Sequence, residues 1–179
     1  MIIDFKTCPL TGIGIRENEV TTVEENYLQI RYKNQVLGEV IMPKTLFTLL
    51  EHEKYKELFP IIVGIVRENY TKFKKPFELN SPFFENGYKE FTYPKNFDEK
   101  AIHFLNYLSD SGGKEYKSLR VYPDFDYPLA YAINKEEFSR ILYKLKNDEF
   151  IEFNSINKLE GNVISSIDIL LTKKGIAEF

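Results

Sequence analysis

The chain has 179 residues, 43% hydrophobic and 28% charged, with a formal net charge of −3 at pH 7. This composition is that of a globular protein with a buried core, so it excludes global disorder. It also disfavours a chain that binds nucleic acid through non-specific phosphate contacts, because such proteins are usually basic. No apolar run reaches the roughly 18–20 residues of a membrane-spanning helix, so we expect a cytoplasmic protein. One cysteine and two histidines predict no disulfide, no metal and no cofactor.

Residues 1–42 predict a small antiparallel sheet. Three runs rich in β-branched and aromatic residues follow one another at 20–23, 27–32 and 36–42. The pair Asn34-Gln35 lies between the last two runs and favours a hairpin turn. Residues 7–12, Thr-Cys-Pro-Leu-Thr-Gly, precede the sheet and predict a tight turn.

From Pro43 onward the spacing of apolar residues becomes helical. A first helix is predicted behind Pro43 by the leucines at positions 46, 49 and 50. A second begins at Pro60 and is apolar nearly all round in its first half, which is typical of a buried helix. We predict that residues 1–73 form one section of sheet and helices.

Residues 74–96 contain three prolines among polar and aromatic residues and predict a connecting loop. The boundary between two parts of the chain is expected here. The aromatic residues of this stretch are interpreted in two ways, as buried packing between the parts or as an exposed partner-binding cluster, and we favour burial because exposed clusters promote aggregation. They are Phe83, Phe84, Tyr88, Phe91 and Tyr93.

Residues 97–179 begin with a predicted helix that Asp98-Glu99 opens and Gly112-Gly113 ends. A short extended link is expected at 117–121, and the compact apolar residues 127–132 are interpreted as a short helix. Asn134 then predicts the start of another helix, with Glu137 three residues later as in a capping box. That helix carries one apolar stripe at positions i, i+3, i+4 and i+7, which consists of Phe138, Ile141, Leu142 and Leu145.

Two strands are predicted after this helix. They cover 150–153 and 163–171 and flank a polar tip at 157–162. A short closing helix is expected to begin at 172–175. This order of elements is that of a winged helix: a helix, a short helix, an amphipathic helix and a pair of strands. In a winged helix the third helix reads the major groove of DNA.

Two motifs strengthen this resemblance. The ending Leu170-Leu171-Thr172-Lys173-Lys174-Gly175 is similar to the "LT-x-x-G" ending of bacterial winged-helix proteins such as the MarR-like regulators. Glu136-Glu137-Phe138, followed by Leu142, Leu145 and Ile151, matches the helix that precedes it in those proteins. The predicted fold is therefore α+β, with a small antiparallel N-terminal sheet and helices followed by a C-terminal winged-helix domain.

A wider resemblance covers most of the chain. It resembles the N-terminal region of bacterial defence-related proteins that begin with a zinc ribbon, continue through helices and end in a winged helix. Residues 7–12 stand where those proteins have a Cys-Pro-x-Cys knuckle, and residues 58–68 are similar to their "L-S-G-I-x-R-E" helix. In some of them a TIR-like or nucleotide-hydrolysing effector domain follows, at a point that resembles the end of this sequence at Phe179.

The sequence departs from that family in the residues that would bind zinc. Leu10 or Thr11 replaces the second knuckle cysteine, and residues 32–38 offer no second pair, so the four zinc ligands are lost. The resemblance then implies a metal-free sheet in which Cys8 is a small buried hydrophobic residue. The sheet would be held by the packing of Tyr27, Ile30, Tyr32, Val36 and Val40.

The side of the third helix that faces away from the apolar stripe holds the candidate binding residues. They are Lys135, Ser139, Arg140, Tyr143 and Lys144, and Lys146 lies on the same side. One interpretation is contact with phosphates and base edges in a DNA major groove. The other is an ordinary solvated helix surface, whose positive charge is diluted by neighbouring acidic residues.

Catalytic motifs are weak in this chain. Gly112-Gly113-Lys114 lacks the upstream glycine and the Ser or Thr of a phosphate-binding loop, so a helix end is the better interpretation. Asp124 and Asp126 form a close acidic pair, but the flanking prolines favour a turn that caps a short helix. An enzyme that uses these carboxylates with His103 or His52 is one hypothesis; no residues are assigned as catalytic.

Three functional hypotheses therefore stand side by side. The first is a non-enzymatic recognition or adaptor module in a bacterial defence or regulatory system, with a protein or effector partner ranked above duplex DNA because of the acidic charge. The second is a homodimeric winged-helix transcriptional regulator that binds DNA. The third is an enzyme of unrecognised type.

Overall fold

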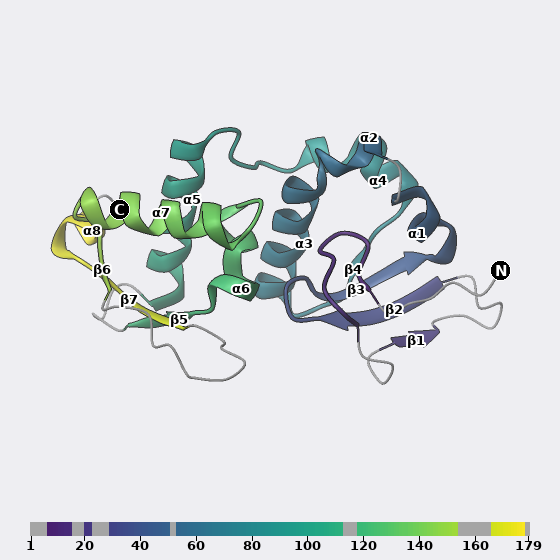
Figure 1. The fold of residues 1–179 in the computed structure, drawn as a ribbon, viewed down its shortest axis with the longest axis horizontal. Helices are drawn as coiled ribbons and strands as arrows, with labels where there is room; N and C mark the ends of the chain where they lie inside the picture. The colour runs from purple at the N-terminus through teal and green to yellow at the C-terminus, as the bar shows by residue number, and fades with distance from the viewer. Residues whose placement is uncertain are drawn as a thin grey trace. The chain divides into compact units, whose positions relative to one another are not determined.

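The structure is a computed structural model that describes residues 7–15, 20–22, 29–50, 53–112, 118–153 and 166–177. The chain divides into two compact units, Met1–Tyr93 and Pro94–Phe179. Figure 1 shows helices and a small sheet in each unit, so the predicted α+β class is confirmed. Tyr27, His52, Lys114 and the predicted polar tip at 157–162 lie outside the described residues.

The first unit contains a four-stranded sheet in the order β1-β2-β3-β4. The strands are β1 (Val20–Thr22), β2 (Gln29–Asn34), β3 (Gly38–Pro43) and β4 (Phe77–Glu78). β1 to β3 are antiparallel and β4 joins β3 in parallel. Side chains alternate along β2 and β3, which buries Ile30, Tyr32 and Val40 on the inner face as predicted.

The turn between β2 and β3 confirms the predicted hairpin. Asn34 Oδ1 accepts hydrogen bonds from the backbone N–H of Val36 at 2.8 Å and of Leu37 at 3.3 Å. Gly38 closes the turn with a φ of +86°, and a Cβ there would overlap the ring of Tyr70. The turn therefore lacks the common Asn-Gly dipeptide, and the Asn34 side chain stabilises it by accepting hydrogen bonds from the turn amides.

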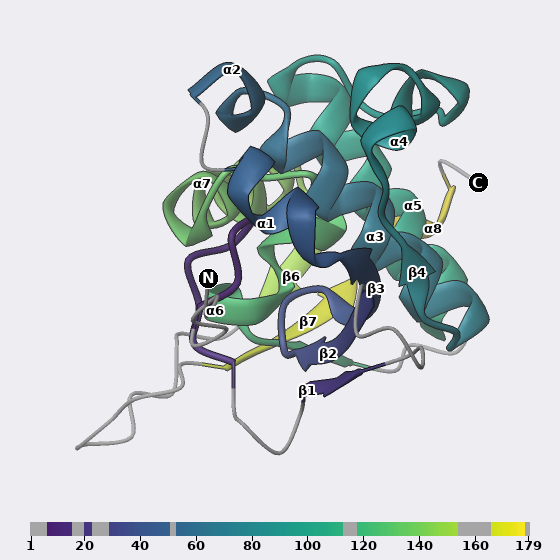
Figure 2. The ribbon, with the colours of Figure 1, turned by 90° about the vertical axis from the view of Figure 1, so that its right-hand side faces the viewer.

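The helices of the first unit cover one face of this sheet (Figure 1 and Figure 2). The first three are α1 (Lys44–Leu50), α2 (Glu53–Lys56) and α3 (Phe59–Phe73). Pro60 lies in the first turn of α3, as predicted, and residues 62–66 are all buried. α3 packs against β3 and β4, which accounts for its continuous apolar segment.

The stretch predicted as a loop at 74–96 contains short regular elements. Besides β4 these are α4 (Ser81–Glu85) and the 3-10 helix η2 (Gly87–Glu90). Proline disrupts a helix when it lies in the interior, but it is tolerated in the first turn. Pro82 lies in the first turn of α4, where Asn80 Oδ1 accepts a hydrogen bond from the Phe83 N–H at 2.9 Å. Phe83 and Phe84 are buried, and the Phe83 ring meets Phe77 and Phe91 edge-on within the first unit.

The second unit begins with α5 (Phe97–Gly112), which confirms the predicted helix. The expected extended link is the strand β5 (Leu119–Val121). Two short helices follow, α6 (Pro123–Asp126) and the 3-10 helix η4 (Tyr127–Ala130).

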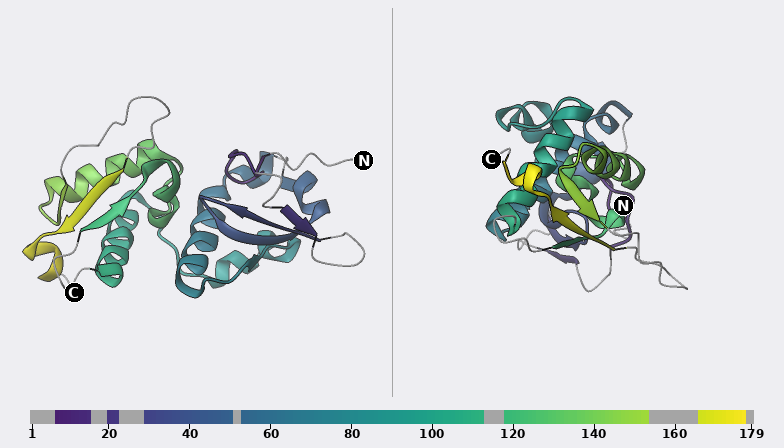
Figure 3. Two further views of the ribbon diagram at one scale, coloured as in Figure 1. Left: turned by 90° about the horizontal axis from the view of Figure 1, so that it is seen from below. Right: turned by 90° about the vertical axis from the view of Figure 1, so that its left-hand side faces the viewer.

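The remaining elements are α7 (Lys135–Asn147), β6 (Ile151–Phe153), β7 (Ile167–Leu171) and α8 (Lys173–Ala177). The three strands form one antiparallel sheet in the order β5-β7-β6, and Figure 3 shows β7 alongside β5. The predicted pairing of the two last strands is therefore confirmed. A sequence pattern could not reveal that β5 belongs to the same sheet, because the register depends on tertiary contacts.

The core of the second unit forms around the apolar stripe of α7. All four stripe residues, Phe138, Ile141, Leu142 and Leu145, are at most 2% exposed, as predicted. Phe138 meets the Phe104 ring of α5 edge-on at 4.9 Å between centroids. The inner side chains of the sheet complete this core.

In the part of the chain that the structure describes, no helix has both the length and the apolar character needed to cross a lipid bilayer.

Candidate functional site

The candidate helix α7 is fixed at its start by a pair of reciprocal caps. Asn134 Oδ1 accepts the Glu137 N–H at 2.9 Å, and the Glu137 carboxylate accepts the Ile133 N–H at 2.6 Å. The same device starts α5, where Asn96 Oδ1 accepts the Glu99 N–H at 2.9 Å and Glu99 accepts the Lys95 N–H at 2.7 Å. Both helices thus begin with Asn-x-x-Glu, which satisfies amides that have no partner within the helix.

A largely shielded ion pair joins the two helices. Lys100 Nζ of α5 donates to both carboxylate oxygens of Glu137, at 3.0 and 3.1 Å. Both side chains are largely shielded from water, with exposures of 14% and 11%. This contact ties the start of α7 to α5, and the buried apolar stripe determines which side of α7 faces outward.

None of the five predicted residues Lys135, Ser139, Arg140, Tyr143 and Lys144 belongs to the buried stripe of α7, and we call the surface that they form the α7 face. Tyr143 is 53% exposed and meets the Phe153 ring edge-on at 5.6 Å. Arg140 is exposed and has no ion-pair partner among the described residues. The Ser139 hydroxyl donates to the Lys135 carbonyl at 2.8 Å.

The two lysines of the α7 face are already paired. Lys135 Nζ lies 2.8 Å from Asp124 Oδ1, and this hydrogen bond raises the pKa of Lys135. Lys144 Nζ lies 3.1 Å from Asp148 Oδ2 and 3.3 Å from Asp98 Oδ1, and these contacts raise the pKa of Lys144. Both lysines are charged at neutral pH, but the adjacent carboxylates reduce the positive electrostatic potential at this surface.

The structure brings only part of the predicted set together. At roughly 100° per residue around the helix axis, Ser139, Arg140 and Tyr143 share the middle of the face. Lys135 and Lys144 lie on its opposite edges, each turned toward an acidic partner. The central patch of the α7 face is thus a tyrosine, an arginine and a serine rather than a row of free cations.

The acidic pair of the enzyme hypothesis is engaged by separate groups. Asp124 binds Lys135, and Asp126 Oδ2 accepts the Tyr122 N–H at 2.9 Å at the start of α6. Asp126 is the residue before η4 but its side chain makes no cap bond there, so the predicted capping of the next short helix is wrong; Asp126 instead binds back to the residue before α6. His103 meets the Tyr131 ring edge-on at 5.0 Å.

Residues 7–12, compared above with a zinc knuckle, form a turn closed by backbone hydrogen bonds. The Cys8 N–H donates to Ile13 and the Gly12 N–H donates to Cys8, both at 2.9 Å. Cys8 is fully buried, as predicted, and its Sγ lies 3.3 Å from Tyr32 Oη. Burial, together with Cys8, raises the pKa of Tyr32 well above its ordinary value. No cluster of three or more potential metal ligands occurs among the described residues.

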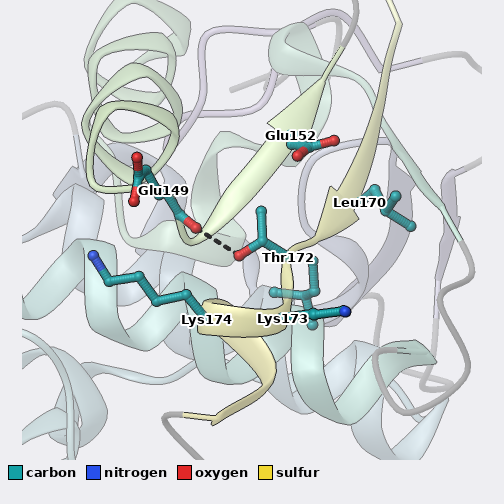
Figure 4. Close-up of a pocket in the computed structure, with 7 residues that line it drawn as sticks. Glu149, Glu152, Leu170, Thr172, Lys173 and Lys174 are labelled. Carbon is teal, nitrogen blue, oxygen red and sulfur yellow. Dashed lines mark hydrogen bonds between the residues drawn. The ribbon is translucent and has the colours of Figure 1, made fainter.

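The "LT-x-x-G" residues close the second unit at the end of β7. The Thr172 hydroxyl donates to the Glu149 carbonyl at 2.5 Å, drawn in Figure 4, and accepts the Gly175 N–H at 3.0 Å. A Cβ on Gly175 would overlap the Phe150 carbonyl oxygen. The motif is therefore a cap on α8 plus a glycine that lets α8 approach the chain before β6.

Figure 4 also shows the shallow pocket beside this motif, with a volume of about 530 Å³. Its charged lining consists of Glu149, Glu152, Lys173 and Lys174. Lys174 Nζ donates to the Asp148 carbonyl at 2.7 Å. None of the residues of the α7 face lines this pocket.

Sequence analysis missed a groove between α5 and α7, which we call the α5–α7 groove. It has a volume of about 410 Å³. Ile102 of α5 forms part of its wall and is 59% exposed. The sequence signal that could have indicated this groove is Ile102. It is an apolar residue that does not share the side of α5 on which Ala101, Phe104 and Leu105 lie.

Comparison with known proteins gave no match: no family model, no curated protein and no solved structure is significantly similar to this chain.

Proposed function

We propose that this chain is a non-enzymatic recognition module whose second unit is a winged helix that binds a protein partner through the α7 face. The bacterial defence or regulatory setting of this proposal rests on the sequence resemblance alone. The choice of a protein partner rests on the charges and exposure of the α7 face. Lys135 and Lys144 are each paired with a carboxylate, while Tyr143 and Arg140 are exposed to solvent.

Two features support the winged-helix assignment. The elements follow the order α5, β5, α6, α7, β6, β7, with a three-stranded antiparallel sheet in the order β5-β7-β6. The amphipathic α7 packs its apolar stripe into the core and leaves its other side in solvent. The cap at Asn134 and the pair between Glu137 and Lys100 hold the start of this helix in place.

The charges favour a protein over a DNA duplex. Binding to DNA gains most of its affinity from cations that displace counterions from phosphates. Here the carboxylates of Asp124, Asp98 and Asp148 lie beside Lys135 and Lys144 and reduce the positive field that a phosphate would meet, and the chain carries a net charge of −3. Tyrosine and arginine, by contrast, are enriched at protein interfaces and supply much of their binding energy.

A second candidate function, a homodimeric DNA-binding regulator, is favoured by one observation. Ser139 and Arg140 lie on an exposed helix that a strand pair follows, and these residue types contact phosphates and base edges in the major groove. Under this alternative Arg140 would be the principal base or phosphate contact of the helix.

The test compares the native chain with an Arg140→Glu/Tyr143→Ala variant. Both are used to capture proteins from a lysate of the native host, and Lys75→Glu, an exposed charge reversal in the first unit, serves as the control. We expect one protein that the native chain and the control retain in equal amounts and that the double variant loses. A partner that all three chains retain equally would refute the role of the α7 face.

The same chains are titrated with a fluorescent mixed-sequence duplex at low and at moderate salt. Under the proposed function the duplex binds weakly and Arg140→Glu changes little. Tight binding that falls steeply with salt and that Arg140→Glu abolishes would establish the DNA alternative instead.

A further inference from the structure

We propose that the α5–α7 groove is a homodimer interface, in which Ile102 of each copy enters the groove of the other. The floor of the groove is apolar and consists of Ala101, Leu105 and Leu145, which are buried against the core below. Apolar side chains at the base of an open groove favour an apolar side chain as the occupant.

The occupant is present on the same surface. Ile102 lines the groove on α5 and is 59% exposed, so its side chain is available to a neighbouring molecule. A two-fold rotation places identical patches face to face, so a patch that holds a projecting side chain next to a hollow is complementary to itself. A second copy therefore supplies what the groove lacks without any other partner.

The charges at the rim also suit a second copy. Lys144 Nζ lies between Asp98 Oδ1 at 3.3 Å and Asp148 Oδ2 at 3.1 Å, so both signs of charge border the apolar floor. In a two-fold contact the Lys144 ammonium of one copy can face the Asp98 carboxylate of the other. The Asp98 side chain is 76% exposed, so it can exchange its partner within the chain for one across the interface with little cost in desolvation.

This interface is independent of the proposed function. Lys144 belongs to both surfaces and Arg140 lies one turn before it, whereas Ser139 and Tyr143 lie roughly 100° or more from Lys144 around the α7 axis and so point away from the groove. A dimer would present two copies of the α7 face. The dimer can thus exist or fail whether the α7 face binds a protein or DNA.

The experiment measures the mass of the full chain by sedimentation equilibrium over a wide range of protein concentration. We expect a reversible monomer–dimer equilibrium for the native chain. Ile102→Glu should raise the dimer dissociation constant by at least about 30-fold, because it places a charge in an apolar contact. Ile133→Glu is the matched control, since Ile133 is 61% exposed and does not line the groove; it should leave the dissociation constant within about 2-fold.

Charge reversals test the orientation of the two copies. Asp98→Lys and Lys144→Asp should each weaken the dimer, and the double variant should recover much of the loss because the pair is restored with opposite polarity. Circular dichroism of every variant checks that the fold is retained. A native chain that stays monomeric at about 200 μM, or a dimer that Ile102→Glu leaves intact, overturns the proposal.

Discussion

Lys100 Nζ of α5 contacts both oxygens of the Glu137 carboxylate, which in turn accepts the Ile133 N–H at the start of α7. One carboxylate therefore serves as a helix cap and as half of an interhelical ion pair. Charges that are shielded in this way stabilise the fold only as a set, because removing one partner leaves the other buried and unpaired.

Glu137→Gln should destabilise the second unit by roughly 2–4 kcal/mol, since Lys100 loses its counter-charge while most of its side chain stays shielded. The free energy of unfolding in urea measures the effect. Glu136→Gln is the control, because Glu136 is an exposed neighbour on the same helix. Equal midpoints for the two variants would contradict the structural role of Glu137.

Phe138→Ala should cost roughly 3–5 kcal/mol of unfolding free energy, because it removes a fully buried ring and leaves a cavity beside Phe104. Denaturant unfolding of the second unit checks this value. Ile133→Ala, at an exposed position before the same helix, should change the stability by less than about 0.5 kcal/mol. A loss below 1 kcal/mol for Phe138→Ala, about the limit for an exposed residue, would mean that the stripe does not face the core.

Gly175→Ala should destabilise the chain by about 1–3 kcal/mol, because the new methyl group cannot coexist with the Phe150 carbonyl and α8 must move. Thermal and urea unfolding measure the loss. Gly87→Ala is a suitable comparison, since its Cβ would come no closer than 3.3 Å to the Phe83 side chain and 3.6 Å to the Pro82 oxygen. If the two substitutions cost the same, close packing of α8 is not the reason for the glycine.

Stability should fall at alkaline pH through Tyr32. Burial holds the pKa of Tyr32 well above its ordinary value, so the folded chain keeps the phenolic proton more tightly than the unfolded chain does. This contribution is complete below about pH 10 and is lost as the pH rises further. Unfolding free energies measured between neutral and strongly alkaline pH should therefore decline, and Tyr32→Phe should flatten that decline. An unchanged alkaline slope in Tyr32→Phe would show that other groups cause it.

The local elements of this chain were predictable from sequence, because their signals act over a few residues. Helical spacing identified α3 and α7, and Asn134 with Glu137 located the start of α7. The residues of the α7 face were also found in this way, because a helix with one apolar stripe must expose its opposite side. The segment at 74–96 was misjudged because proline disrupts a helix interior but suits its first turn, as at Pro82.

The tertiary structure decided which elements distant in sequence contact one another. Only the fold shows that Lys135 and Lys144 are paired with Asp124, Asp98 and Asp148, which changes the expected field of the α7 face. Only the fold places Ile102 beside a groove. Spacing along the chain specifies which side chains share a face of one helix, whereas charge pairing and surface shape depend on how helices pack, and that information is non-local.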